Sequence, residues 1–183
     1  GEVLAEFDPT DTASLGEAVL LVDQIAAHLQ SSDKDDLAHK NADGTWSLQE
    51  IRVRYQHDGL GRLTSATGLG TLVSDDGFGN RTWGTIHQTY VVLRNQAKIR
   101  FSTTKTDTVY PDGSVNHQEV TVTNTYTPKG ALMGVQGAGF FVSTDSIGNM
   151  TTGRLTQLYD ASLLKSTGQA KVSQNLTRSI THN

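Results

Sequence analysis

The chain has 183 residues, which is long enough for one domain with a hydrophobic core. It carries 15 Lys and Arg residues against 19 Asp and Glu residues, a net charge of −4, and no basic cluster of the kind that binds nucleic acid. It has no Cys, which excludes disulfides, thiolate metal sites and a Cys nucleophile. No apolar run approaches the roughly 18 residues of a membrane-spanning helix, so we expect a soluble protein.

Residues 1–45 have a different pattern from the rest of the chain. Ser14 and Glu17 form a candidate capping box at the start of a helix. Apolar residues then recur at helical spacing: Leu15, Ala18, Val19, Val22, Ile25, Ala26 and Leu29. We therefore expect an amphipathic helix over 14–30, followed by a charged connector and a turn at 41–44. No signal peptide is recognisable.

Residues 46–183 read as β-strands, because Thr, Val and Tyr are abundant and turns containing Gly recur throughout. The expected strands are 47–57, 61–74, 80–94, 96–108, 114–127, 131–144, 149–160 and 169–181. A tight corner is expected at Asn95 and a turn at 166–168. Every connection is short, so neighbouring strands should be antiparallel.

The strand region contains an internal repeat. Sliding residues 61–90 by 69 positions onto residues 130–159 gives 13 identities in 30 positions. With four extra residues in the second copy, residues 96–99 also match residues 169–172. The two copies span about 47–115 and 116–183, and each should form four strands.

Eight antiparallel strands in chain order lose their two exposed edges most simply by closing. We therefore predict an eight-stranded, up-and-down, calycin-like β-barrel over residues 46–183. Gly68, Gly70, Gly137 and Gly139 would either make room for a ligand or relieve strand curvature. An outer-membrane barrel is disfavoured, because the strands show no apolar band with aromatic girdles.

Alternating residues along the expected strands define one face that is more apolar than the other. We assign this face to the interior; it comprises Ile51, Val53, Tyr55, Ile86, Gln88, Tyr90, Ala97, Ile99, Phe101, Val120, Val122, Tyr126, Leu155, Gln157 and Tyr159. The opposite face carries charged side chains: Arg52, Arg54, Lys98, Arg100, His117, Glu119 and Arg154. The inward amides and phenols need partners, which are either each other or a ligand. The inverted register, with Trp83, His87 and Leu93 inside, is the alternative.

Motifs for metal or cofactor chemistry are absent from the sequence. No His pair has metal-ligand spacing, and no nucleophile elbow occurs. The acidic segment 75–80 lacks the order of a calcium loop and is interpreted as a hairpin turn. We expect no cofactor and no metal.

A wider arrangement of residues resembles a known family. It comprises Tyr-x-x-Asp-x-x-Gly at 55–61, a Gly-rich strand to Val73, Gln88 two residues before Tyr90, and then Leu93 and Ile99. It is similar to the allene oxide cyclase-like barrels, in particular the small bacterial spirotetronate and spirotetramate cyclases, which are Diels–Alderases. The resemblance implies a soluble eight-stranded barrel without a cofactor, a polyketide-derived substrate held inside, and an N-terminal lid. The helix over 14–30 suits a lid, or else a fixed element that plugs or flanks the barrel.

The resemblance and the apolar face together suggest a site in the barrel cavity. Gln88, Gln157 and Tyr90 are the candidate catalytic residues, because their amides or phenol would donate a hydrogen bond to the dienophile's carbonyl. The candidate substrate-binding residues are Tyr55, Trp83, Ile86, Phe101, Val122, Tyr126, Phe141, Leu155 and Tyr159. An intramolecular cycloaddition depends mainly on holding the substrate folded, so it requires no acid/base pair, and the spacing suggests none.

Two other functions would use the same strands. One is a non-catalytic carrier of the lipocalin type, and the other is a structural or assembly subunit of an extracellular surface. The expected partner is a small apolar polyketide-like molecule and not nucleic acid. A homodimer is the other association considered. We expect a cytoplasmic location, with secretion as the alternative.

Overall fold

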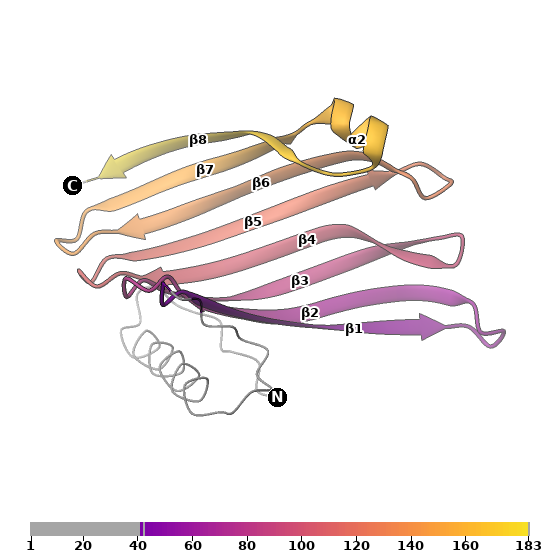
Figure 1. Cartoon of the computed structure of the whole chain (residues 1–183), viewed down its shortest axis with the longest axis horizontal. Helices are drawn as coiled ribbons and strands as arrows, with labels where there is room; N and C mark the ends of the chain where they lie inside the picture. The colour runs from indigo at the N-terminus through magenta and orange to yellow at the C-terminus, as the bar shows by residue number, and fades with distance from the viewer. Residues whose placement is uncertain (1–40, 42, 183) are drawn as a thin grey trace.

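The computed structural model describes residues 41 and 43–182 and shows an all-β protein built on one sheet (Figure 1). The eight strands lie side by side in chain order. They are β1 (Trp46–His57), β2 (Leu63–Asp75), β3 (Arg81–Leu93), β4 (Gln96–Val109), β5 (Val115–Tyr126), β6 (Leu132–Thr144), β7 (Met150–Tyr159) and β8 (Val172–His182). Each strand is antiparallel to its neighbours, which confirms the up-and-down antiparallel arrangement predicted from the sequence.

Local turn chemistry sets the ends of the strands. In the β3–β4 turn, Arg94 and Asn95 both adopt positive φ angles, 51° and 63°, as the two central residues of a type I′ hairpin turn require. The side chain of Asn95 also accepts a hydrogen bond from the backbone N–H of Leu63 at 2.7 Å, which ties this turn to the start of β2. The tight corner expected at Asn95 is therefore where the sequence predicted it.

Among the described residues, the helix α2 (Ala161–Thr167) lies in the connection between β7 and β8. Asp160 caps its first turn by accepting hydrogen bonds from the backbone N–H groups of Ser162 and Leu163, and Gly168 ends it at φ 73°. The sequence predicted only a turn here, so the strand expected over 169–181 begins later, at Val172. The helix expected over 14–30 lies outside the described residues.

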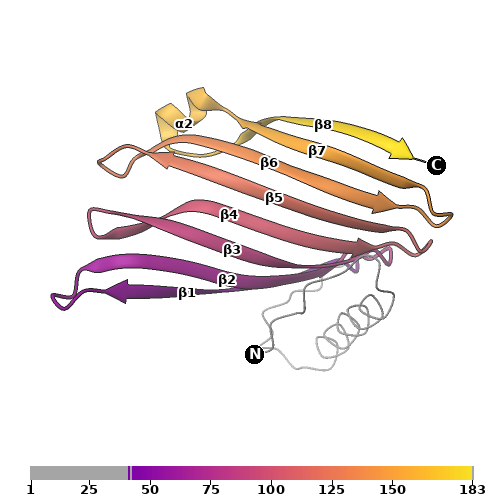
Figure 2. The same ribbon diagram turned by 180° about the vertical axis from the view of Figure 1, so that it is seen from behind.

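The sheet is open, with β1 and β8 at its two opposite edges (Figures 1 and 2). The predicted closure into a barrel is therefore not confirmed. Direct cross-strand partners form one row that runs across all eight strands. That row is Leu48, Val73, Trp83, Asp107, His117, Val142, Thr152 and Ile180. The stagger of a barrel is set where the row returns from the last strand to the first. Among the described strands β8 does not pair with β1, so the row ends at Ile180.

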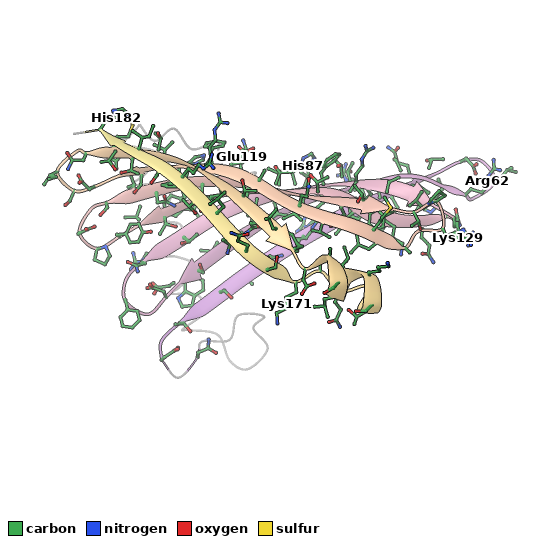
Figure 3. All side chains as sticks on the ribbon, turned by 90° about the horizontal axis from the view of Figure 1, so that it is seen from above. Arg62, His87, Glu119, Lys129, Lys171 and His182 are labelled. Carbon is green, nitrogen blue, oxygen red and sulfur yellow. The ribbon has the colours of Figure 1, made fainter. Side chains whose placement is uncertain are left out.

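Cross-strand partners point to the same side of a sheet, so the register divides the side chains between two faces. We name one the glycine face, after Gly68, Gly70, Gly84, Gly137, Gly139 and Gly153. We name the other the charged face, after Glu50, Arg52, Lys105, His117, Glu119 and Arg154. Figure 3 shows His87 and Glu119 on one side of the sheet and α2 on the other.

The apolar residues assigned to one face share the glycine face, with a single exception. A bulge in the β3–β4 ladder pairs Thr89 with Phe101 and the next residue, Tyr90, with Ile99. This extra residue in β4 moves Phe101 to the charged face while Ile99 stays on the glycine face. Phe101 is 37% exposed there, and the guanidinium of Arg100 lies 5.2 Å from the centre of its ring.

Buried side chains lie on both faces of the sheet. Ala66, Ile86 and Val135 are buried on the glycine face, where Leu164 of α2 is also buried and the helix packs against β6. The buried residues of the charged face lie near the start of β1 and are Trp46, Val73, Trp83 and Asp107.

Gly70 and Gly139 occupy equivalent positions in the two repeats and let neighbouring strands approach closely. A Cβ atom at Gly139 would overlap the carbonyl oxygen of Glu119 and lie 3.0 Å from the Cα of Val120. A Cβ atom at Gly70 would meet the backbone of β1 in the same way. At these two positions the structure favours strand approach over room for a ligand.

We expect Gly139→Ala to lower the free energy of unfolding by about 1–3 kcal/mol, because the strands must separate to admit the methyl group. Gly59→Ala is the matched control, since a Cβ at Gly59 meets nothing within 4 Å; its effect should stay within about 0.5 kcal/mol. Urea denaturation followed by circular dichroism measures both. Equal effects of the two substitutions would contradict this role for Gly139.

Candidate functional site

Gln88 and Tyr90 form a hydrogen-bonded pair on the glycine face of β3. The Tyr90 hydroxyl donates to Oε1 of Gln88 at 2.7 Å. The direct partner of Gln88 on β2 is Gly68, where a Cβ atom would lie 3.0 Å from Oε1 of Gln88. The missing side chain at Gly68 therefore leaves the space in which the Gln88 amide lies.

The second repeat carries the same three residue types in the same register. Gln157 of β7 lies opposite Gly137 of β6, and the Tyr159 hydroxyl is 3.4 Å from Oε1 of Gln157. A Cβ atom at Gly137 would lie 2.9 Å from the Cβ of Gln157, closer than real Cβ contacts allow. The chain thus presents two Gln–Tyr–Gly clusters on one face: Gly68, Gln88 and Tyr90 in the first, and Gly137, Gln157 and Tyr159 in the second.

Burial affects the pKa values of two phenols on this face. It raises the pKa of Tyr90, and the neighbouring Tyr55 phenol raises it further. Burial also raises the pKa of Tyr126, whose hydroxyl donates to the backbone carbonyl of Ile99 at 2.8 Å. Tyr90 and Tyr126 therefore act as hydrogen-bond donors, and each uses its proton on an acceptor within the protein.

The Gln88–Tyr90 hydrogen bond orients the amide. Because Oε1 of Gln88 accepts from the phenol, the two N–H bonds of its Nε2 are left as donors. Within residues 43–182, Nε2 of Gln88 and Nε2 of Gln157 donate no hydrogen bond to another group. Each cluster can therefore donate to an oxygen atom of a bound molecule.

Most of the other residues suggested by the sequence lie around these clusters. Those on the glycine face are Tyr55, Ile86, Val122, Tyr126, Phe141, Leu155 and Tyr159. Tyr55 lies on the edge strand β1 and is 56% exposed. Trp83 and Phe101 lie on the charged face, where Trp83 is buried. His87, a residue of the alternative register, is exposed on that same face.

An acid/base pair that the sequence analysis missed lies on the charged face. Asp107 of β4 and His117 of β5 are direct partners, and Oδ1 of Asp107 is 2.7 Å from Nδ1 of His117. Asp107 is only 7% exposed, and the His117 ring lies 6.1 Å from the Phe140 ring. The spacing of residues in the sequence suggested no such pair. Counting outward from the 110–114 turn would have found it, because the two residues are equally far from that turn.

Opposing effects act on the carboxyl group of this pair. Burial raises the pKa of Asp107, while the hydrogen bond and charge of His117 act in the lowering direction; the net direction is upward. The next pair on the same face is Lys105 with Glu119, whose charged atoms are 3.5 Å apart. The Asp107–His117 hydrogen bond and the Lys105–Glu119 ion pair join the first repeat to the second across the β4–β5 boundary.

Two further properties concern the described part of the chain. Its residues include no group of three or more His, Cys, Asp or Glu side chains placed to hold a metal ion. No helix formed by those residues has the length and apolar character needed to cross a lipid bilayer.

Comparisons of the chain with protein-family models, with curated proteins and with solved structures give no match.

Asp107→Asn should change how stability depends on pH. Because the folded state raises the pKa of Asp107, it binds a proton more tightly than the unfolded state, and stability falls as pH rises above the ordinary value of 3.8. The substitution removes that loss. In urea denaturation between pH 3.5 and 5.5, the variant should gain stability relative to the unmodified protein as pH rises.

Asp112→Asn is a control with the opposite expected sign. Hydrogen bonds from the side chain and backbone of Ser114 lower the pKa of Asp112, so its contribution is lost as pH falls. That variant should therefore lose relative stability as pH rises over the same range. The same slope for both variants would contradict the cause assigned to Asp107.

Proposed function

We propose that the glycine face binds a small, largely apolar molecule that carries a carbonyl group, and that the amides of Gln88 and Gln157 donate to that carbonyl. The observation that carries this proposal is the Gln–Tyr–Gly cluster, present twice in one register. In each cluster the glycine makes room for the amide, and the tyrosine faces its oxygen atom. The amide nitrogen is thereby left for a ligand.

The surroundings of the clusters support an apolar ligand. Ile86, Val122 and Leu155 lie on the same face, as does the ring of Phe141. Helix α2 packs against β6, the strand that carries Gly137, and so covers part of this face near the second cluster. A few fixed polar groups among apolar side chains are the usual composition of a small-molecule site.

The reaction that such a site would assist is an intramolecular Diels–Alder cyclisation of a linear polyketide-type substrate. Holding the diene and the dienophile folded together removes the entropy cost of bringing them into contact. A hydrogen bond from Gln88 or Gln157 to the dienophile's carbonyl strengthens as electron density moves onto its oxygen. Tyr90 acts as a positioning residue, because its proton is already bonded to Gln88. No proton is transferred in this reaction.

Ligand binding can be tested with prodan, an apolar naphthyl ketone whose emission reports both polarity and hydrogen bonding at its carbonyl. We expect Gln88→Leu and Gln157→Leu each to weaken prodan binding by about threefold to tenfold, the value of one net hydrogen bond. The emission of bound prodan should also shift to shorter wavelength. Gln136→Leu is the matched control, because Gln136 is exposed on the charged face and should leave both signals unchanged.

Native mass spectrometry of the protein, before and after incubation with an extract of its host, tests the reaction. A cyclised isomer of unchanged mass, formed more slowly by Gln88→Leu and Gln157→Leu at equal folding stability, is the expected result. A bound molecule released unchanged would replace the cyclase with a carrier. A protein that binds neither prodan nor any extract component would contradict the proposal.

A further inference from the structure

The two edge strands of the sheet are long and unpaired among the described residues. β1 has 12 residues and β8 has 11, and every residue of β8 is exposed. Neither strand contains Pro, and the only Lys, Arg, Asp or Glu in β8 is Arg178. β1 carries the charged residues Glu50, Arg52 and Arg54, whereas β8 has little such protection; both edges present a row of backbone N–H and C=O groups to another strand.

The internal repeat indicates which strand would fit each edge. β5 corresponds to β1 by the shift of 69 positions, and β8 corresponds to β4 by a shift of 73. The ladders agree with both shifts: His87 pairs with Thr103 in the first repeat, and Thr156 pairs with Leu176 in the second. Within the chain, β4 pairs with β5 where the two repeats meet. By the same rule, the free edge of β8 fits the free edge of a β1 strand.

The β4–β5 register, transferred by these shifts, fixes which residues of β8 and β1 would lie opposite each other. Thr106 faces Gln118 in the structure, so Ser179 would face Gln49. The other pairs follow by the same transfer: Asn175 with Val53, Thr177 with Ile51, Arg178 with Glu50, Ile180 with Leu48, Thr181 with Ser47, Leu176 with Arg52, Gln174 with Arg54 and His182 with Trp46. On the glycine face, Ser, Thr or Asn of β8 would meet Val, Ile, Gln or Ser of β1, much as at the β4–β5 boundary.

Two of the pairs on the charged face are complementary in this register, whereas Leu176 would lie opposite the aliphatic part of the Arg52 side chain. The Lys105–Glu119 ion pair corresponds to Arg178 opposite Glu50, which again joins a cation to a carboxylate. The Asp107–His117 pair corresponds to Ile180 opposite Leu48. Both members of that second pair are apolar, so neither would leave a charge facing an aliphatic side chain.

Charge at the β8 edge also points to an acidic partner. Arg178 lies directly opposite Arg154 of β7, and like charges in that position destabilise a sheet. Across the strands that the structure describes, neither of these arginines has a carboxylate partner. Glu50 of an incoming β1 strand would supply one.

We propose that β8 of one copy of this chain adds antiparallel to β1 of a second copy in this register, so that copies join head to tail into a continuous sheet. A second copy fits better than closure within one chain for two reasons. β1 and β8 lie at opposite edges of the sheet (Figure 1). If β8 paired in this register with β1 of its own chain, the row from Leu48 to Ile180 would return to Leu48 without stagger. A closed barrel does not permit this. Head-to-tail contacts of this kind produce rings or filaments.

Engineered cysteines test the register, since the natural chain has none. Ser47→Cys and Thr181→Cys are placed on separate full-length chains, which are mixed and oxidised; both positions are exposed, so folding should be unaffected. Directly opposite strand residues have Cα atoms about 4.5–5.5 Å apart, within disulfide range. We expect a disulfide between the two chains. Thr177→Cys, four residues away on the same face, is the control and should not link to Ser47→Cys.

Charge reversal tests the interface without cysteines. Sedimentation velocity over a concentration series should show association of the unmodified chain. Arg178→Glu or Glu50→Arg alone should weaken it by about threefold to tenfold, because attraction across the pair becomes repulsion. In a mixture of the two variants, the β8 edge that carries Arg178→Glu would meet the β1 edge that carries Glu50→Arg, so association should recover through that contact.

Three results would overturn the proposal. One is a chain that stays monomeric at every concentration. The second is a disulfide that forms only inside a chain carrying both Ser47→Cys and Thr181→Cys, which would show closure instead. The third is equal linking of Ser47→Cys to Thr177→Cys and to Thr181→Cys, which would refute the register. None of these results depends on ligand binding by the glycine face.

Discussion

Cross-strand register is the constraint on which the rest of this structure depends. In an antiparallel ladder, each side chain shares a face with its partner, so a shift by one residue would exchange the two faces. The register places Gly68 opposite Gln88 and Gly137 opposite Gln157, which gives each amide its space. The same register brings Asp107 to His117 on the other face. Both the Gln–Tyr–Gly clusters and the Asp107–His117 pair therefore depend on turns that hold the strands in one alignment.

Glycine residues have two different structural roles on the glycine face. At Gly70 and Gly139 the neighbouring backbone occupies the place of a side chain, so these residues let adjacent strands approach. At Gly68 and Gly137 the space is occupied by a glutamine side chain. Residues only two positions apart thus serve packing and a candidate site separately. Because the distinction depends on what lies opposite each glycine, it cannot be made without the register.

Local signals in the sequence were sufficient for the strands and their order. Turns such as Arg94–Asn95 mark the strand ends, and alternation marks the apolar face that carries Gln88 and Gln157. Features that depend on more than one strand were missed. The bulge that moves Phe101 to the charged face is a property of the β3–β4 ladder, and the Asp107–His117 pair requires two strands to be aligned. Whether β8 meets β1 depends on the twist and curvature accumulated over the whole sheet, which no single turn reveals. The cap at Asp160 was a local signal for α2, but the sequence analysis used only the turn residues at 166–168.

The proposed junction between copies also continues the spacing of the candidate sites. Within one chain, Gln88 and Gln157 lie on the same cross-strand row of the glycine face, four strands apart, because Gln88, Ser102, Val122, Gly137 and Gln157 are successive partners. The row goes on to Asn175, which would face Val53 of the next copy, and from there to that copy's Gly68 and Gln88. That distance is again four strands, or about 19 Å at the usual strand separation. The junction that best satisfies the charges at Arg178 and Glu50 would therefore place the glutamine amides of successive copies in one evenly spaced line.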